Sequence, residues 1–92
     1  MSGDNWQLYI LRCAGGELYT GITKDVPRRL QEHQSGGPKA AKYLRGRGPL
    51  QLVYREEIGG HGDALRREMA VKKLSKRAKL SLIAKSAVMP GE

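Results

Sequence analysis

The chain has 92 residues, of which 39% are hydrophobic and 28% are charged, so it has room for one domain with a single modest core. One cysteine, Cys13, excludes an internal disulfide and a cysteine-based zinc site, and no apolar run approaches the roughly 20 residues of a membrane-spanning helix. Seventeen Lys and Arg residues against nine Asp and Glu residues give a net charge of +8. The first residues do not resemble a signal peptide, so we expect a cytoplasmic protein without a membrane partner.

The first predicted elements are two strands joined as a hairpin. Residues 7–13 are rich in residues that favour strands, residues 14–16 form a turn with two glycines, and residues 17–23 form the returning strand. A three-residue loop that contains glycine is a common hairpin connection.

The register of this hairpin decides where its two tyrosines lie. If Cys13 pairs with Glu17, then Tyr9 lies opposite Gly21, and Tyr19 projects from the same face of the sheet as Tyr9. A slip of one residue would place the two tyrosines on opposite faces. We expect the first register.

A helix and a third strand follow the hairpin. Asp25 is expected to cap a helix that ends near Gln34, and within it Arg29 and His33 lie one turn apart on the same face. The basic segment 39–47 is expected to include a short helical turn. Alternation of apolar and polar residues then predicts a strand from Leu50 to Glu57.

Two helices complete the predicted order β-β-α-β-α-α. Residues 59–62 are expected to form a flexible connection, Asp63 to cap a helix that ends near Leu74, and Ser75 to cap a last helix of roughly residues 76–86. We expect one domain over residues 6–84 and a tail over residues 85–92.

The first of these two helices has an acidic residue in an unusual place. Helical spacing places Ala64, Leu65, Met69 and Val71 in one apolar arc. Glu68 lies in the middle of this arc. A carboxylate that points toward a core is costly unless a partner compensates its charge. Lys72, four residues on, is one candidate partner, with a pair worth about 0.2–0.5 kcal/mol. For an inward-facing carboxylate, a metal ion in a polar cleft compensates the negative charge better than Lys72 does.

An ordered set of short motifs resembles the GIY-YIG nuclease domain. The two elements that give the family its name correspond to Gln7-Leu8-Tyr9 and Tyr19-Thr20-Gly21, and the segments 28–33, 40–43 and 65–68 follow in the family's order. The resemblance covers roughly residues 6–84. It is greatest to the small stand-alone YhbQ-like (UPF0213-type) proteins of this superfamily.

The resemblance implies an α/β (α+β) fold in which helices flank a mixed, largely antiparallel three-stranded sheet, and a metal-dependent endonuclease that hydrolyses phosphodiester bonds. It implies catalytic roles for Tyr9, Tyr19, Arg29, His33 and Glu68. Tyr9 would be the general base, with His33 as the alternative base. Arg29 would hold a phosphate oxygen, and Glu68 would bind Mg²⁺ or Mn²⁺. Without the resemblance, both tyrosines could be half-buried strand residues, which is the commoner fate of a tyrosine in a strand.

The positive charge is concentrated where the nucleic acid would bind. Residues 24–55 contain eight basic and two acidic side chains, and residues 62–92 contain eight and three. We expect contacts with the nucleic acid from Arg28, Lys39, Lys42, Tyr43, Arg45, Arg47 and Lys72. DNA is the favoured partner, in branched, nicked or single-stranded form, with DNA repair as a process that uses such cleavage. The protein would be a monomer or a weak dimer without an obligate protein partner.

One departure from the family pattern supports a different function. Many family nucleases have an asparagine about a dozen residues beyond the glutamate, where this chain has Ala78-Lys79-Leu80. The alternative is therefore a catalytically weak or inactive nucleic-acid-binding module with the same fold. The charge alone also fits an adaptor that binds ribosomes or proteins.

Overall fold

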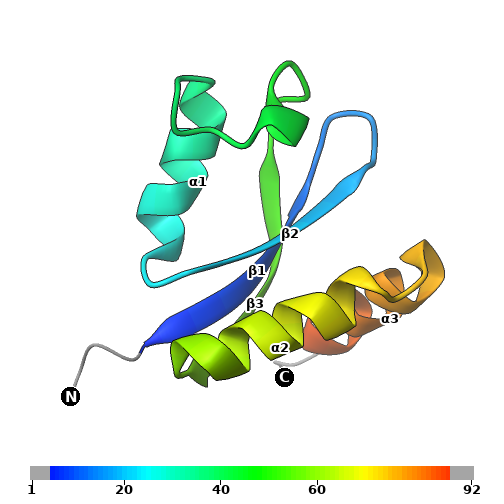
Figure 1. The fold of residues 1–92 in the computed structure, drawn as a ribbon. Coiled ribbons are helices and arrows are strands. Elements are labelled where there is room, and N and C mark those ends of the chain that lie inside the picture. Colours follow the sequence, from blue (N-terminus) through cyan, green and yellow to red (C-terminus); the bar gives the residue numbers. More distant parts are fainter. Residues whose placement is uncertain (1–4, 88–92) are drawn as a thin grey trace.

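The computed structural model describes residues 5–87, which form one three-stranded sheet with helices on both of its faces (Figure 1). In chain order the elements are β1 (Trp6–Arg12), β2 (Leu18–Thr23), α1 (Val26–Ser35), the short 3-10 helix η1 (Lys42–Leu44), β3 (Gln51–Gly59), α2 (His61–Lys72) and α3 (Lys76–Ala87). The predicted α+β fold and its order of elements are confirmed.

The sheet is wholly antiparallel, which corrects the expectation of a mixed sheet. The strand order is β2-β1-β3, and β1 pairs antiparallel with both of its neighbours. The strands β2 and β3 therefore run in the same direction. They do not form a parallel pair because β1 lies between them.

The predicted register of the hairpin is confirmed. Tyr9 lies opposite Gly21, and Tyr19 lies opposite Leu11. The turn closes through the backbone N–H of Cys13, which donates to the carbonyl oxygen of Glu17 at 2.8 Å. Both tyrosines consequently project from one face of the sheet.

Each face of the sheet has its own core. On the face of Tyr9 the buried residues come from β1, α1 and the segment around η1: Tyr9, Leu11, Cys13, Val26, Leu44 and Leu50. On the opposite face Leu8 and Ile10 of β1 pack with Val71 of α2, and half-buried Leu82 and Ile83 of α3 complete this core. The central strand β1 therefore supplies buried side chains to both cores.

The helix ends agree with the sequence at α1 and α3 and differ at α2. The side chain of Asp25 accepts from the backbone N–H of Arg28 at 3.2 Å, and that of Ser75 accepts from Ala78 at 3.1 Å, as predicted caps should. However, α2 begins at His61, because Gly60 takes the extended conformation of an N-cap residue. Asp63, the predicted cap, lies within the first turn of the helix.

The C-terminal boundary also shifts. Helix α3 continues to Ala87, so residues 85–87 belong to the helix instead of the predicted tail. The rest of that tail, residues 88–92, lies outside the described residues. Within residues 5–87, no helix has the length and apolar composition that crossing a bilayer requires.

Candidate active site

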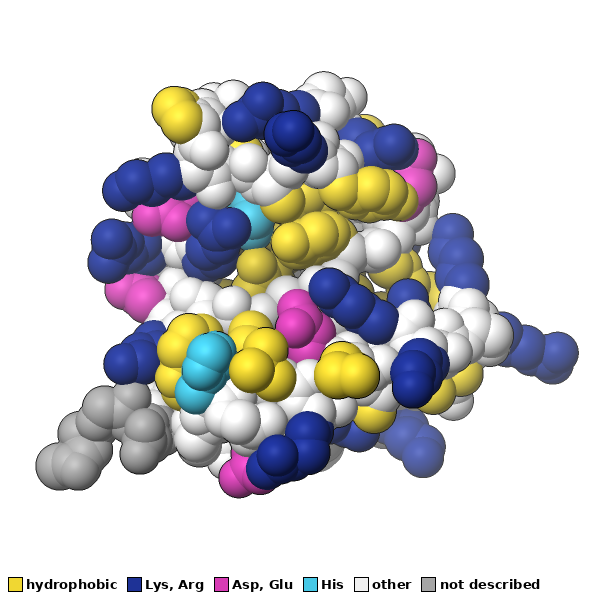
Figure 2. All heavy atoms as spheres, viewed as in Figure 1, with side chains coloured by type: hydrophobic (Ala, Val, Ile, Leu, Met, Phe, Trp, Pro, Cys, Tyr) yellow, Lys and Arg dark blue, Asp and Glu magenta, His cyan; other side chains and the backbone are white. Residues whose placement is uncertain are grey.

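The predicted catalytic residues gather on the face of the hairpin that carries both tyrosines. Strands β1 and β2 contribute Tyr9 and Tyr19, and α1 contributes Arg29 and His33. Figure 2 shows this side of the molecule, where hydrophobic side chains and a histidine lie in a hollow between the α1 region above and α2 below, surrounded by Lys and Arg side chains. The hollow is therefore an aromatic centre within a basic rim.

The centre of the site is a buried hydrogen bond between Tyr9 and His33. The phenolic oxygen of Tyr9 lies 2.9 Å from Nε2 of His33, and each residue is only 2% exposed. The ring of Tyr9 reaches across β2 at Gly21, where an added Cβ would lie 2.5 Å from the phenolic oxygen. A glycine is required at this position because no side chain fits beneath the tyrosine.

A backbone group fixes the protonation of the histidine ring. The N–H of Ala41 donates to Nδ1 of His33 at 3.2 Å, so Nδ1 carries no hydrogen. In the neutral ring the hydrogen is then on Nε2, which donates to the oxygen of Tyr9. Burial, reinforced by the positive charge of Arg29, lowers the pKa of His33 to about 4, so the neutral form prevails at neutral pH.

The phenol of Tyr9 is strongly perturbed by its surroundings. Burial raises the pKa of Tyr9 to about 12, and the nearby Tyr19 and the Glu68 carboxylate add to this rise. The guanidinium of Arg29 acts in the opposite direction. Arg29 and Glu68 therefore act on the pKa of Tyr9 in opposite directions, although they come from different helices.

Further aromatic side chains form one wall of the hollow. Tyr19 makes an edge contact with His33, with ring centroids 5.6 Å apart, and stacks on Tyr43 of η1 at 6.1 Å. The guanidinium of Arg47 lies 4.4 Å from the centroid of the Tyr43 ring. Arg47 is itself held by Glu17, whose carboxylate accepts from Nη1 at 2.9 Å. The short helix η1 thus completes the wall that β2 begins.

The two neighbouring arginines of α1 have different surroundings. Nη1 of Arg29 donates to Glu32 at 2.9 Å and to the carbonyl oxygen of Lys39 at 2.8 Å, and its side chain is 31% exposed. The side chain of Arg28 is 68% exposed and makes a longer ion pair with Glu32, at 3.4 Å. Arg29 is therefore held in place by two partners, whereas Arg28 extends into solvent.

The predicted apolar arc of α2 is only half buried. Ala64 and Val71 are fully buried, but Leu65 and Met69 are 42% and 59% exposed. Glu68 lies between these two groups, at the edge of the core, with its side chain 18% exposed. The arc was expected to face the core throughout. In fact the sheet covers one side of it, and the other side borders the hollow.

Lys72 competes only weakly with a metal ion for the carboxylate of Glu68. Lys72 approaches it at 3.3 Å in an i,i+4 pair, but the Lys72 side chain is 54% exposed and can move away. Among residues 5–87, no group of three or more His, Cys, Asp and Glu side chains is arranged as a metal cage. A single carboxylate suits Mg²⁺, which keeps most of its waters and takes other ligands from its substrate.

The residues predicted to contact nucleic acid fall into two groups. Four basic side chains of α1 and of residues 39–45 are exposed and have at most a weak acidic partner in the described part of the chain: Arg28, Lys39, Lys42 and Arg45. Arg47 and Lys72 are engaged by Glu17 and Glu68, and Tyr43 is 44% exposed within the aromatic wall. The first group is the freer to bind phosphates.

Two parts of the site escaped the sequence reasoning. The backbone N–H of Ala41, which fixes the ring of His33, has no signature in the sequence. The close approach of the Tyr9 ring to Gly21 does have a signature in the sequence, because the predicted register places Tyr9 opposite a glycine.

Comparisons with known proteins identify relatives of nearly the whole chain. The model of the GIY-YIG catalytic domain matches residues 5–81. A UPF0213 protein of Klebsiella pneumoniae is 56% identical over 79 residues, which cover 86% of this chain and 73% of that protein. A UPF0213 protein of Yersinia pestis is 54% identical over 83 residues, which cover 90% and 85% of the two chains.

Solved structures agree with these relatives. The solution NMR structure of the UPF0213 protein from Bacillus halodurans is 48% identical, with a TM-score of 0.56, and the match covers 87% of this chain and 83% of that one. The solution NMR structure of a protein from E. faecalis is 29% identical, with a TM-score of 0.61 and coverage of 96% and 93%.

Proposed function

Because the chain belongs to the GIY-YIG catalytic domain family and is a UPF0213 protein within that nuclease family, we propose that it is a metal-dependent endonuclease that hydrolyses phosphodiester bonds in nucleic acid. We propose DNA as its substrate. The observation that carries the proposed nuclease activity is the buried Tyr9–His33 pair, whose histidine is oriented by Ala41. The charges of Arg29 and Glu68 both act on Tyr9.

Tyr9 is the general base in this proposal, and His33 orients it. Nδ1 of His33 is occupied by the N–H of Ala41 and Nε2 carries the hydrogen bonded to Tyr9, so neither nitrogen has a lone pair free to take a proton from water. Burial raises the pKa of Tyr9, so its phenolate forms only if the charges of Arg29 and of the divalent ion that Glu68 would hold oppose that rise. The phenolate oxygen then takes the proton as a water molecule attacks phosphorus. The Nε2–H of His33 donates a hydrogen bond to the phenolate oxygen and so stabilises its negative charge before the proton is transferred.

Arg29 supplies charge to the phosphate. Its bonds to Glu32 and to the carbonyl oxygen of Lys39 hold the guanidinium beside Tyr9, so little ordering remains when a phosphate binds. A planar guanidinium matches two phosphate oxygens, and it favours the extra negative charge that develops on them in the transition state. Tyr19 limits the space beside the phosphate and positions the attacking water.

Glu68 would hold the divalent ion. When bound, Mg²⁺ or Mn²⁺ would polarise the phosphate and stabilise the leaving oxygen. The residues present fit this role, because within residues 5–87 the half-buried carboxylate has the exposed Lys72 as its only ion-pair partner.

A second candidate function is a binding module that no longer cleaves. Lys79 of α3 lies in the segment where many family nucleases have an asparagine, and it lines a cavity together with Glu17 and Tyr43. A lysine there adds to phosphate binding, and it cannot replace the hydrogen-bonding capacity of an amide. The basic rim would then hold nucleic acid without hydrolysis.

The substitution Glu68→Gln separates the two candidates. The amide keeps the size of the side chain and removes its charge, so cleavage in Mg²⁺ should fall by about 100-fold or more, the scale on which enzymes lose rate when one group that stabilises charge is removed. Binding of labelled DNA in EDTA should stay near the wild-type level, because the basic rim is unchanged.

Two variants serve as controls. Asp63→Asn removes an exposed carboxylate from the first turn of the same helix and should leave cleavage intact. Lys72→Ala removes the partner of Glu68 together with one predicted contact to nucleic acid, so it should weaken binding but not reduce cleavage at saturating DNA. If Lys72→Ala were as inactive as Glu68→Gln, the ion pair itself would be the functional element and the metal role of Glu68 would be wrong. If the wild type bound DNA but never cleaved it in Mg²⁺ or Mn²⁺, the binding module would be the correct function.

A further inference from the structure

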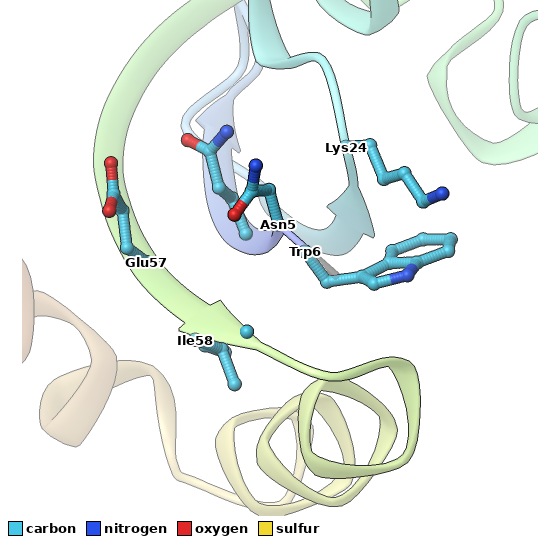
Figure 3. Close-up of a pocket in the computed structure, with 7 residues that line it drawn as sticks. Asn5, Trp6, Lys24, Glu57 and Ile58 are labelled. Atoms are coloured by element: carbon cyan, nitrogen blue, oxygen red, sulfur yellow. The ribbon is translucent and has the colours of Figure 1, made fainter. Parts of the chain in front are cut away.

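A cavity with a different character lies where β1 begins and β3 ends (Figure 3). Its volume is about 550 Å³, within the range of small-molecule sites. Polar side chains dominate its lining, together with one indole: Asn5, Trp6, Gln7, Lys24, Glu57 and Ile58. None of these residues belongs to the candidate active site.

Trp6 presents an aromatic face to this cavity. The ring of His61 stacks against the indole, with centroids 4.3 Å apart and planes inclined by 29°. Nζ of Lys24 lies over the indole at 5.7 Å from its centroid. In Figure 3, Lys24 and Asn5 lie on one side of the indole, and α2, which begins at His61, passes on the other side. His61 therefore supports the ring from behind and fixes its plane.

The charge and the hydrogen-bonding groups of the cavity indicate what it binds. Lys24 and Glu57 carry opposite charges, so the lining has no excess of positive charge to hold a phosphate. The side-chain amide of Gln7 is oriented by Arg55, whose Nε donates to its oxygen at 2.7 Å, which leaves the NH₂ group to donate to a ligand. Asn5 offers both a donor and an acceptor. A flat, uncharged ring with polar edges matches this lining.

We propose that the cavity binds one unpaired nucleobase of the substrate strand, stacked on Trp6. The proposal rests on the proposed function and specifies its substrate as a single-stranded or locally unpaired nucleic acid. Every base has a π-face, so stacking on the indole is tolerant of sequence. A base within an intact duplex would first have to leave its stack, which costs a few kcal/mol.

The position of the cavity fits a strand that also reaches the active site. Trp6 precedes Tyr9 by three positions on β1, about 10 Å along the strand. Alternation places the Trp6 side chain on the face of Leu8 and Ile10, so a bound strand would pass around the end of β1 to reach both sites. Lys24 also lines a neighbouring cavity together with Arg28 and Arg29. A phosphate at Arg29 and the base of a nearby nucleotide on Trp6 can therefore belong to one strand, with Lys24 between them.

The fluorescence of Trp6 tests this site directly, because it is the only tryptophan of the chain. The wild-type protein is titrated in EDTA, at low salt, with a short single-stranded DNA and with an abasic strand of the same length and charge. We expect the DNA to quench Trp6 and to bind roughly ten-fold more tightly than the abasic strand, since stacking on an aromatic side chain contributes on this scale. The abasic strand should leave the emission unchanged.

Two variants, measured by the anisotropy of labelled strands, separate stacking from folding. Trp6→Phe keeps an aromatic face and should keep most of the preference for the strand with bases. Trp6→Leu keeps apolar contact with His61 but should bind both strands equally. Equal binding of the two strands by the wild type, with no quenching, would refute the base site and leave the proposed function intact. If neither strand bound at low salt, the proposed function would fail, and the base site with it.

Discussion

The buried histidine makes the stability of the protein depend on pH in a way that one substitution should remove. His33 is 2% exposed, and burial lowers its pKa from 6.5 to about 4. In the unfolded chain the ring takes up a proton near pH 6.5, whereas the folded protein resists protonation until about pH 4. The unfolded state thus binds more protons between these values, and stability falls as pH falls.

The size of the effect follows from the shift. One pKa unit corresponds to 1.36 kcal/mol, so lowering the pH from 7 to 5 should cost about 2 kcal/mol of unfolding free energy through His33. Carboxylates contribute little in this range. Glu32, for example, has a pKa below its usual 4.5 because it accepts a hydrogen bond from Arg29. The change between pH 7 and pH 5 therefore reports chiefly on the histidine.

Urea unfolding at pH 7 and pH 5, followed by circular dichroism, measures this change. In His33→Gln the loss between the two pH values should shrink by about 2 kcal/mol, because the amide can bond Tyr9 but does not titrate. His61→Gln removes the other, exposed histidine and should behave like the wild type. If His33→Gln lost as much stability as the wild type, the pKa of His33 would not be lowered in the folded protein and the histidine would not be held neutral.

Three further outcomes are expected. Gly21→Ala should destabilise the fold by about 1–3 kcal/mol in thermal unfolding and abolish cleavage, because its Cβ would displace the Tyr9 ring; wild-type activity in this variant would contradict the geometry. Arg29→Ala should reduce turnover much more than binding, and Arg28→Ala mainly binding, in single-turnover and equilibrium assays; equal losses of turnover would mean that the site assignment is wrong. Affinity for duplex DNA should fall with salt at a log–log slope of about −0.9 per phosphate neutralised, and a flat dependence would exclude the basic rim.

Local chemistry explains which parts of the fold could be predicted. The hairpin register depends on a glycine-containing turn and on alternation within two short segments, and it was predicted correctly. The caps of α1 and α3 depend on a single side chain each, Asp25 and Ser75, and were also correct. These features are decided by neighbours in the sequence, so the sequence is sufficient to predict them.

Features set by distant contacts were predicted less well. The direction of β3 relative to its neighbour depends on which edge of the sheet it joins, and no short motif encodes that choice. The helical period placed Leu65 and Met69 in one arc with Val71, but it cannot tell which part of an arc the sheet will cover. The start of α2 was missed because Gly60 serves as its N-cap residue without a side chain.

The central place of β1 in the sheet has a consequence for how the protein is made. Gln7 and Arg55, which contact each other across β1 and β3, lie 48 positions apart in the chain. During synthesis, β1 and β2 can pair early, but Leu8 and Ile10 lack their final cover until β3, α2 and α3 have followed. Closing so long a loop slows folding. The nascent hairpin therefore exposes an apolar face and a free strand edge. Until β3 and the two helices have folded onto it, the hairpin is the part of the chain that most needs protection from aggregation.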